Sequence, residues 1–179
     1  MAVEEALRQE VLDFAGSWVA RWNAHDVDGV LALVTEDVAW EDPSIDGTAR
    51  GQTEARQYIE SLLRAFPDMV WAMPTGLFVA LDHDEEILGI GQPWVCHGTA
   101  LGPIDPPGFA PTGRAFELEG FDVWELHRGE RRLRKVVSHY DALEFARRAG
   151  LMPARGTGEE RMLVRLQRLR ARLTRRRAR

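Results

Sequence analysis

The 179-residue chain is long enough to bury the core of one domain without disulfides, and its 45% hydrophobic and 28% charged residues are typical of a soluble protein. A single cysteine, Cys96, excludes an internal disulfide and most zinc patterns, and it indicates a reducing compartment. No apolar run reaches the roughly 20 residues of a membrane span, and the N-terminal segment is acidic, so we expect a cytoplasmic protein without membrane contact.

The net charge of −5 conceals an asymmetry between the two ends of the chain. Residues 1–146 hold 11 basic and 26 acidic side chains, whereas residues 147–179 hold 12 basic and 2 acidic ones. The basic charge is therefore concentrated in the C-terminal segment.

Three helices and one strand are predicted in the first half of the chain. An amphipathic helix is expected over 3–23, because large apolar side chains recur there at helical spacing. They are Leu7, Val11, Phe14, Trp18 and Trp22. A short helix over 29–34 and a strand over 38–43 follow, and a third helix over 53–66 ends before Pro67.

The second half is predicted to consist mainly of long strands. They span residues 70–81, 86–99, 115–126 and 133–141, and a brief helix over 141–150 follows. Helices followed by mainly antiparallel strands predict an α+β domain, in which a curved sheet wraps a helix.

We divide the chain into a domain over 1–153, a linker over 154–158 and an arginine-rich amphipathic helix over 159–179. Its apolar stripe consists of Met162, Leu166, Leu169 and Leu173. We expect this helix to dock on its own domain or on a dimer mate, and the alternative is a solvated, frayed tail. Nucleic-acid binding through the arginines is not expected, because the domain itself is acidic.

Two aspartates are predicted to lie on buried faces of strands. Side chains alternate along a strand, so Asp42 shares the inward side with Val38 and Trp40. Asp122 likewise shares a face with Phe116, Leu118, Trp124 and Leu126. A buried carboxyl resists ionisation, so two of them in one cavity could divide the roles of base and acid.

Structural roles remain as alternatives for these residues. Asp42 precedes Pro43 and could brace a turn, while Asp122 could be a buried group that is bonded to the backbone or to a tyrosine. The six tryptophans are core residues by default, but several together could line a cavity for a flat apolar ligand. We find no metal-ligand spacing and no nucleotide-binding motif, so neither a metal nor a cofactor is expected.

Four segments together resemble the SnoaL-like polyketide cyclases, or ester cyclases, of the nuclear-transport-factor-2-like superfamily. They are WNAHDVDGVLALVTEDVAWEDP, GQTEARQYIESLLRAFPDM, HGTALG with PTGRAFELEG, and SHYDALEFARRAGLMP, within about residues 8–153. The resemblance implies a cone-shaped α+β barrel with a curved mixed sheet, a deep pocket, a dimer and a secondary-metabolite substrate. Ser138 stands where these cyclases carry a catalytic aspartate, and their frequent GTH is GTA, ending at Ala100.

The two aspartates are also similar in placement to those of ketosteroid isomerases. That resemblance implies a general base at Asp42 and a protonated oxyanion-hole acid at Asp122, with Trp18 at the place of the oxyanion tyrosine. Related enzymes that open epoxides or close pyran rings use a similar pair of acids.

These observations lead to the hypothesis of a cofactor-free enzyme that acts on an apolar, carbonyl-bearing small molecule by general acid–base catalysis. Asp42 and Asp122 are the expected catalytic residues. The expected substrate-binding residues are Trp18, Trp40, Trp94, His97, Trp124, Ser138 and Tyr140. The alternative is a small-molecule-binding protein of the same fold that does not catalyse a reaction.

Overall fold

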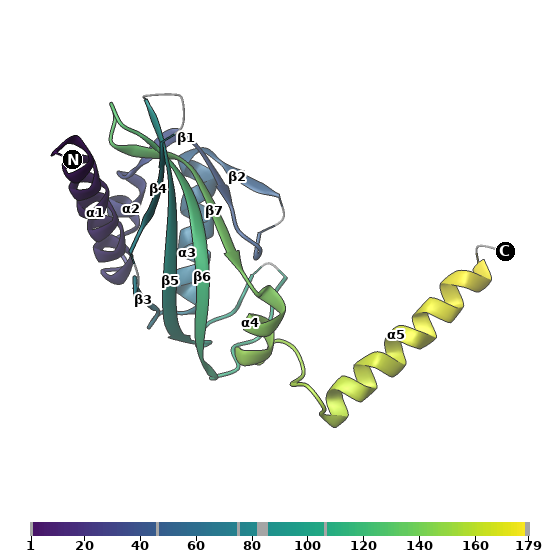
Figure 1. Ribbon diagram of the computed structural model, residues 1–179. Helices are drawn as coiled ribbons and strands as arrows, with labels where there is room; N and C mark the ends of the chain where they lie inside the picture. The colour runs from purple at the N-terminus through teal and green to yellow at the C-terminus, as the bar shows by residue number, and fades with distance from the viewer. Residues whose placement is uncertain (1, 46, 75, 82–85, 106, 178–179) are drawn as a thin grey trace.

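The computed structural model describes residues 2–45, 47–74, 76–81, 86–105 and 107–177 (Figure 1). The helices are α1 (Ala2–Asn23), α2 (Val27–Leu31), α3 (Gly51–Ala65), α4 (Ala142–Arg148) and α5 (Gly158–Arg177). The strands are β1 (Val34–Glu41), β2 (Thr48–Arg50), β3 (Val70–Ala72), β4 (Phe78–Leu81), β5 (Ile87–Thr99), β6 (Ala115–His127) and β7 (Arg132–Tyr140).

All seven strands belong to one mixed sheet in the order β2-β1-β7-β6-β5-β3, with β4 also paired to β5. The β1–β7 pair is parallel, and the other pairs are antiparallel. Helix α3 packs against β1 and β2, and α1 packs against β3. Figure 1 shows the sheet curving around α3. The predicted α+β fold with a curved mixed sheet is confirmed.

The core lies between the helices and the inner face of the sheet. Trp124 of β6 is fully buried, and its ring contacts Phe14 and Trp18 of α1 at centroid distances of 6.2 and 5.4 Å. Trp18 stacks in turn on Trp40 of β1 at 5.6 Å. The tryptophans thus join the first helix to the sheet, and they contribute large buried areas to the core.

The prediction of one strand over 70–81 is wrong, because β3 and β4 are separate. Pro74 lies between them and has no N–H to donate to a strand ladder.

Strand β2 was not predicted. The second helix starts earlier than expected because Asp26 caps it, accepting a hydrogen bond from the Gly29 N–H at 2.9 Å. Strand β1 therefore begins at Val34 rather than at residue 38.

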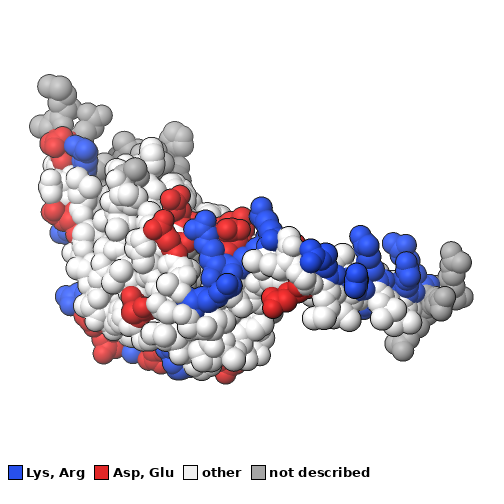
Figure 2. Space-filling model, turned by 90° about the horizontal axis from the view of Figure 1, so that it is seen from below, with Lys and Arg blue, Asp and Glu red and all other residues white. Residues whose placement is uncertain are grey.

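Helix α5 extends away from the rest of the chain (Figure 1). Docking of α5 on its own domain is therefore a wrong prediction, since Met162 and Leu166 are 60% and 57% exposed. An ion pair of 3.6 Å between Arg147 and Glu160 lies at its base. Figure 2 shows its basic side chains gathered along one side. Within the described residues, no helix combines the length and apolarity of a membrane span.

Candidate functional site

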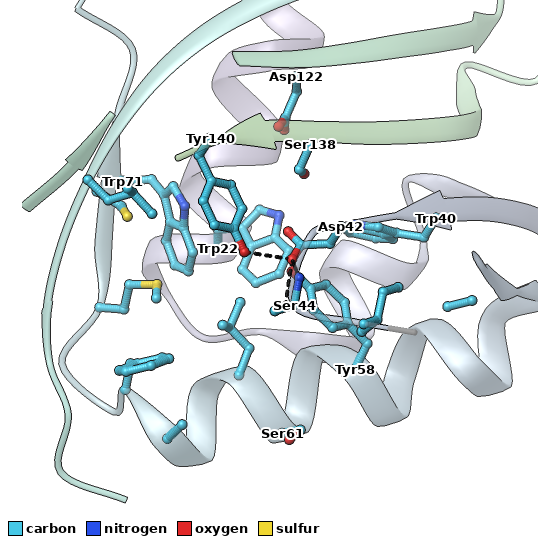
Figure 3. Close-up of a pocket in the computed structure, with 18 of the residues that line it drawn as sticks. Trp22, Trp40, Asp42, Ser44, Tyr58, Ser61, Trp71, Asp122, Ser138 and Tyr140 are labelled. Carbon is cyan, nitrogen blue, oxygen red and sulfur yellow. Dashed lines mark hydrogen bonds between the residues drawn. The ribbon is translucent and has the colours of Figure 1, made fainter. Parts of the chain in front are cut away.

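A cavity of about 620 Å³ lies between α1, α3 and the inner face of the sheet. This volume is within the range of roughly 300–1,000 Å³ that is usual for small-molecule sites. Its wall is mostly aromatic and apolar, and it includes Trp18, Trp22, Trp40, Trp71, Phe66 and Leu118. Polar groups gather at the end of the cavity where β1, β6 and β7 meet (Figure 3).

Strand register places three polar side chains in one row of this wall. Asp122 on β6 is opposite Gln92 on β5 and opposite Ser138 on β7. All three line the cavity. The side chains of such a row share one face of the sheet and lie side by side.

Asp42 follows the last residue of β1, and it is held by the turn after it and by β7. Its Oδ1 accepts hydrogen bonds from the Ser44 N–H at 2.8 Å, the Ser44 hydroxyl at 2.5 Å and the Tyr140 hydroxyl at 2.8 Å. Figure 3 shows these bonds on one oxygen, while the other points toward Asp122 and Ser138. Hydrogen bonds on Oδ1 fix the orientation of the carboxylate, and Oδ2 faces the cavity.

Two tyrosines contact the Asp42 carboxylate, and neither phenol ionises readily. Burial, together with the charge of Asp42, holds the pKa of Tyr58 well above its usual range. Burial, followed by the charge of Asp42, also raises the pKa of Tyr140. Both phenols therefore remain neutral hydrogen-bond donors beside the carboxylate.

Asp122 is only 8% exposed, and both of its oxygens accept hydrogen bonds from indoles. Trp94 donates to Oδ1 at 2.7 Å, and Trp124 donates to Oδ2 at 3.3 Å. Burial raises the pKa of Asp122 to about 6 and the charge of Asp42 adds to the rise, whereas hydrogen bonds from Trp94, Ser138 and Trp124 oppose it. The direction agrees with the predicted acid, although only roughly a tenth of the carboxyl is protonated at pH 7.

Gly120 makes room for the indole that holds Asp122. Trp94 is opposite Gly120 in the β5–β6 register. A Cβ added to Gly120 would lie 2.1 Å from Cζ2 of Trp94, much closer than any real contact. The absence of a side chain at Gly120 therefore lets the indole lie flat and reach Asp122, the next inward residue of β6.

The structure brings most of the predicted site residues together. Trp18, Trp40, Trp94, Ser138 and Tyr140 line the cavity with both aspartates. Asp42 and Asp122 are 9% and 8% exposed, so their predicted inward orientation is correct.

Two of the predicted substrate-binding residues lie elsewhere. The His97 imidazole is half exposed on the outer face of β5, with Nδ1 3.3 Å from a carboxylate oxygen of Glu117. Its neighbour Cys96 takes the inward position instead, because side chains alternate along the strand. Trp124 is buried in the core behind Asp122 and holds that carboxyl without lining the cavity.

The lining residues that sequence reasoning missed include three polar ones, which are Ser44, Tyr58 and Gln92. Tyr58 falls on the helical stripe of Ala55, Ile59 and Leu62, and Gln92 falls in strand phase with Trp94, so both carried a signal. Ser44 carried none, because its position depends on the turn after Pro43. The described residues include no group of three or more His, Cys, Asp or Glu side chains arranged to hold a metal.

A family model of the SnoaL-like domain matches residues 15–135. No curated protein matches the sequence. Among solved structures, a proposed polyketide cyclase from Xanthomonas campestris pv. campestris is 17% identical with a TM-score of 0.61, over 79% of this chain and 98% of that one.

Two further solved structures extend this comparison. A proposed SnoaL-like polyketide cyclase from Jannaschia sp. CCS1 is 15% identical with a TM-score of 0.65, over 82% of this chain and 95% of that one. AclR, a proposed hydroxylase from Streptomyces galilaeus, is 18% identical with a TM-score of 0.64, over 94% of this chain and 97% of that one. At these identities the likeness shows the shared fold.

Proposed function

The chain belongs to the SnoaL-like domain family, and from this premise we propose that it is an enzyme of secondary metabolism that acts on an apolar, carbonyl-bearing small molecule. The reaction is a cyclisation, an isomerisation or an epoxide or pyran ring reaction, carried by general acid–base catalysis without a cofactor. The aromatic wall of the cavity suits such a ligand, because it buries flat apolar surface.

In this proposal Asp42 is the general base. Its Oδ2 takes a proton from a carbon next to the carbonyl, or from an attacking hydroxyl group. The donors on Oδ1 hold the carboxylate in place during this step. Protonated Asp122 donates a hydrogen bond to the oxygen that gains negative charge.

One observation carries this proposal. Two carboxyl groups from different strands open into one largely apolar cavity, and their environments differ. Asp42 is held by a hydroxyl and an N–H from its own turn and by a tyrosine, whereas Asp122 is held by indoles and has a raised pKa. Environments that give two neighbouring carboxyl groups different pKa values are typical of a catalytic acid and base.

Proton abstraction can be tested without knowing the natural substrate. The probe is 2-tetralone in D₂O, whose α-protons exchange when a base removes them, as NMR measures. Asp42→Asn should lower the catalysed exchange about a hundredfold or more, because the amide keeps the shape but loses the basic oxygen. Glu117→Gln, on the outer face, is the matched control and should not change the rate. Equal exchange by the parent and Asp42→Asn would contradict the role of Asp42.

A binding protein without catalysis is the second candidate, because Ser138 stands where the cyclases carry an aspartate. In that case 2-tetralone binds with no exchange above the buffer rate, and Asp42→Asn changes affinity alone.

We also propose a cytoplasmic homodimer formed through the outer face of the sheet. No described helix covers the middle of that face, where Val123 is 40% exposed. Val123→Lys should convert a dimer to a monomer in sedimentation velocity runs, because it introduces a charge at the centre of the contact. A parent protein that is already monomeric would refute this assembly.

A further inference from the structure

The charged side chains in the wall of the cavity are mainly acidic. Five carboxyl side chains line it, and the described lining includes one cation, Arg64. The five are Asp42, Glu54, Glu60, Asp105 and Asp122. Arg56 offsets part of this charge near the mouth, where it pairs with Glu60 at 3.6 Å. The field in the cavity therefore favours cations and repels anions.

Among the described residues, the inner two carboxyls have no cationic hydrogen-bond partner. The hydrogen bonds to Asp42 and Asp122 come from tyrosine and serine hydroxyls, two indoles and a backbone N–H, all of them neutral. Buried carboxylates are normally paired with a positive charge, because desolvation is costly. Here the two lie near each other, so a bound cation would balance their charge when both are ionised.

An unpaired acceptor lies beside this pair. Gln92 is 2% exposed, lines the cavity and is opposite Asp122 in the β5–β6 register. Its Oε1 has no hydrogen-bond donor among the described residues. A buried amide oxygen without a donor costs about 1–3 kcal/mol. The Trp40 N–H likewise has no acceptor in the described part of the chain, and it would suit a neutral oxygen of the same ligand.

The aromatic rings provide a further attraction for positive charge. Trp22 lies near Trp71, with ring centroids 4.8 Å apart, and Trp40 lies near Tyr58 at 5.7 Å. Figure 3 shows Trp22, Trp40 and Tyr58 around the Asp42 carboxylate. The faces of electron-rich rings attract cations.

We propose that the ligand of this cavity carries a protonated amine, whose N–H groups bond to Asp122 and Gln92, beside the negative charge of Asp42. The inference rests on the proposed function in taking this cavity as the substrate site, and it narrows the substrate class to a carbonyl compound with a basic amine. The ammonium replaces the acidic proton of Asp122, so Asp122 is ionised in the complex. The Trp40 N–H then takes over from protonated Asp122 as the hydrogen-bond donor to the oxygen that gains negative charge.

This proposal predicts a dependence on pH. The titratable groups around Asp122 are Asp42 after β1, Tyr58 on α3 and Cys96 on β5. Burial, followed by the charges of the two aspartates, raises the pKa of Cys96 to about 12, and the pKa of Tyr58 is raised as well, so neither is charged near neutral pH. Amine binding should therefore weaken as Asp122 takes up a proton below pH 6.

The test compares two ligands of nearly equal shape. The probes are 2-aminotetralin, which is cationic at neutral pH, and 2-tetralol, its neutral isostere, and their dissociation constants are measured by calorimetry at pH 7.5 and 5. We expect the amine to bind about tenfold tighter or more at pH 7.5. This preference should shrink at pH 5 and in Asp122→Asn and Gln92→Leu, whereas Glu117→Gln on the outer face should retain it.

Equal affinity of the amine and the alcohol for the parent protein at pH 7.5 would overturn the proposal. The pH series uses only the parent protein, so it tests the proposal even if a cavity variant does not fold. The 2-tetralone exchange assay is independent of the amine. If the protein catalyses exchange but does not prefer the amine, only this inference is refuted. If it prefers the amine but catalyses no exchange, only the proposed catalysis is refuted.

Discussion

The Tyr140 hydroxyl donates a hydrogen bond of 2.8 Å to Oδ1 of Asp42, across 98 residues of sequence. This bond joins the last residue of β7 to the residue after β1, where the two parallel strands end. It orients the carboxylate while leaving Oδ2 turned into the cavity (Figure 3). The fold and the proposed base thus depend on the same contact.

Tyr140→Phe should destabilise the protein. The ring remains, but a hydrogen bond to a carboxylate is lost, which costs about 1–2 kcal/mol for a half-buried group. Urea denaturation at pH 7 measures this loss. In the Asp42→Asn background the same change should cost less, since the acceptor is no longer charged. An unchanged midpoint for the single variant would show that the bond contributes nothing.

Stability should fall as the pH rises through the range in which Asp122 ionises. Burial raises the pKa of Asp122 to about 6, whereas the unfolded carboxyl titrates near roughly 3.9. The folded state therefore holds an extra proton between these values. This stabilisation is complete below pH 4 and is lost as the pH passes 6.

The measurement is the melting temperature of the parent and of Asp122→Asn between pH 4 and 8. The variant should show a flatter profile, because its amide does not titrate. Asp105→Asn, an exposed acid at the mouth, is the control and should keep the slope of the parent. Parallel profiles for the parent and Asp122→Asn would mean that Asp122 has an ordinary pKa.

Gly120→Ala should displace the Trp94 indole and weaken its hydrogen bond to Asp122. The added methyl group would lie 2.1 Å from the ring, and overpacking of this kind costs about 1–3 kcal/mol. The pKa of Asp122 should rise further, because the lost donor favours the ionised form. Side-chain carboxyl NMR and denaturation measure the two effects.

Gly16→Ala is the matched control for this substitution. Apart from the local backbone of α1 and the two neighbouring residues, no atom lies within 4 Å of the position that a Cβ at Gly16 would occupy, and Gly16 lies in the middle of α1. This change should stabilise the helix by up to about 1 kcal/mol. If Gly120→Ala behaved in the same way, the steric argument for Trp94 would fail.

Removing residues 158–179 should leave the melting temperature of the remaining domain unchanged. The stripe Met162, Leu166, Leu169 and Leu173 is exposed, and the ion pair of Arg147 with Glu160 is of a kind that contributes about 0–1 kcal/mol. Thermal melts of the two chain lengths test this expectation. A lower melting temperature at high protein concentration would instead indicate docking of α5 on a second copy.

The two aspartates were predictable because the period of a strand is two. Val38 and Trp40 set the inward phase of β1, and Trp124 set that of β6, so the orientations of Asp42 and Asp122 followed from sequence. Their convergence on one cavity did not follow from periodicity. It required the resemblance to a family with a known barrel, because the alternation of side chains along a strand does not show which strands pair with each other.

Strand phase and strand pairing account for the remaining errors. His97 is out of phase with the inward Trp94, so alternation along the strand already places Cys96 inward and His97 outward. The contact of Trp94 with Asp122 depends on the opposite position of Gly120, which only pairing reveals. Ser44 and the cap at Asp26 are local turn features whose geometry depends on the neighbouring chain.

The parallel pairing of β1 with β7 sets the order in which this protein can be completed during synthesis. Asp42 leaves the ribosome early, but its partner Tyr140 emerges only when nearly the whole domain has been translated. Contacts that are distant in sequence form late, because loop closure must precede them. A nascent chain that pauses before β7 therefore lacks Ser138 and Tyr140 in the cavity wall, and it leaves part of the tryptophan core uncovered.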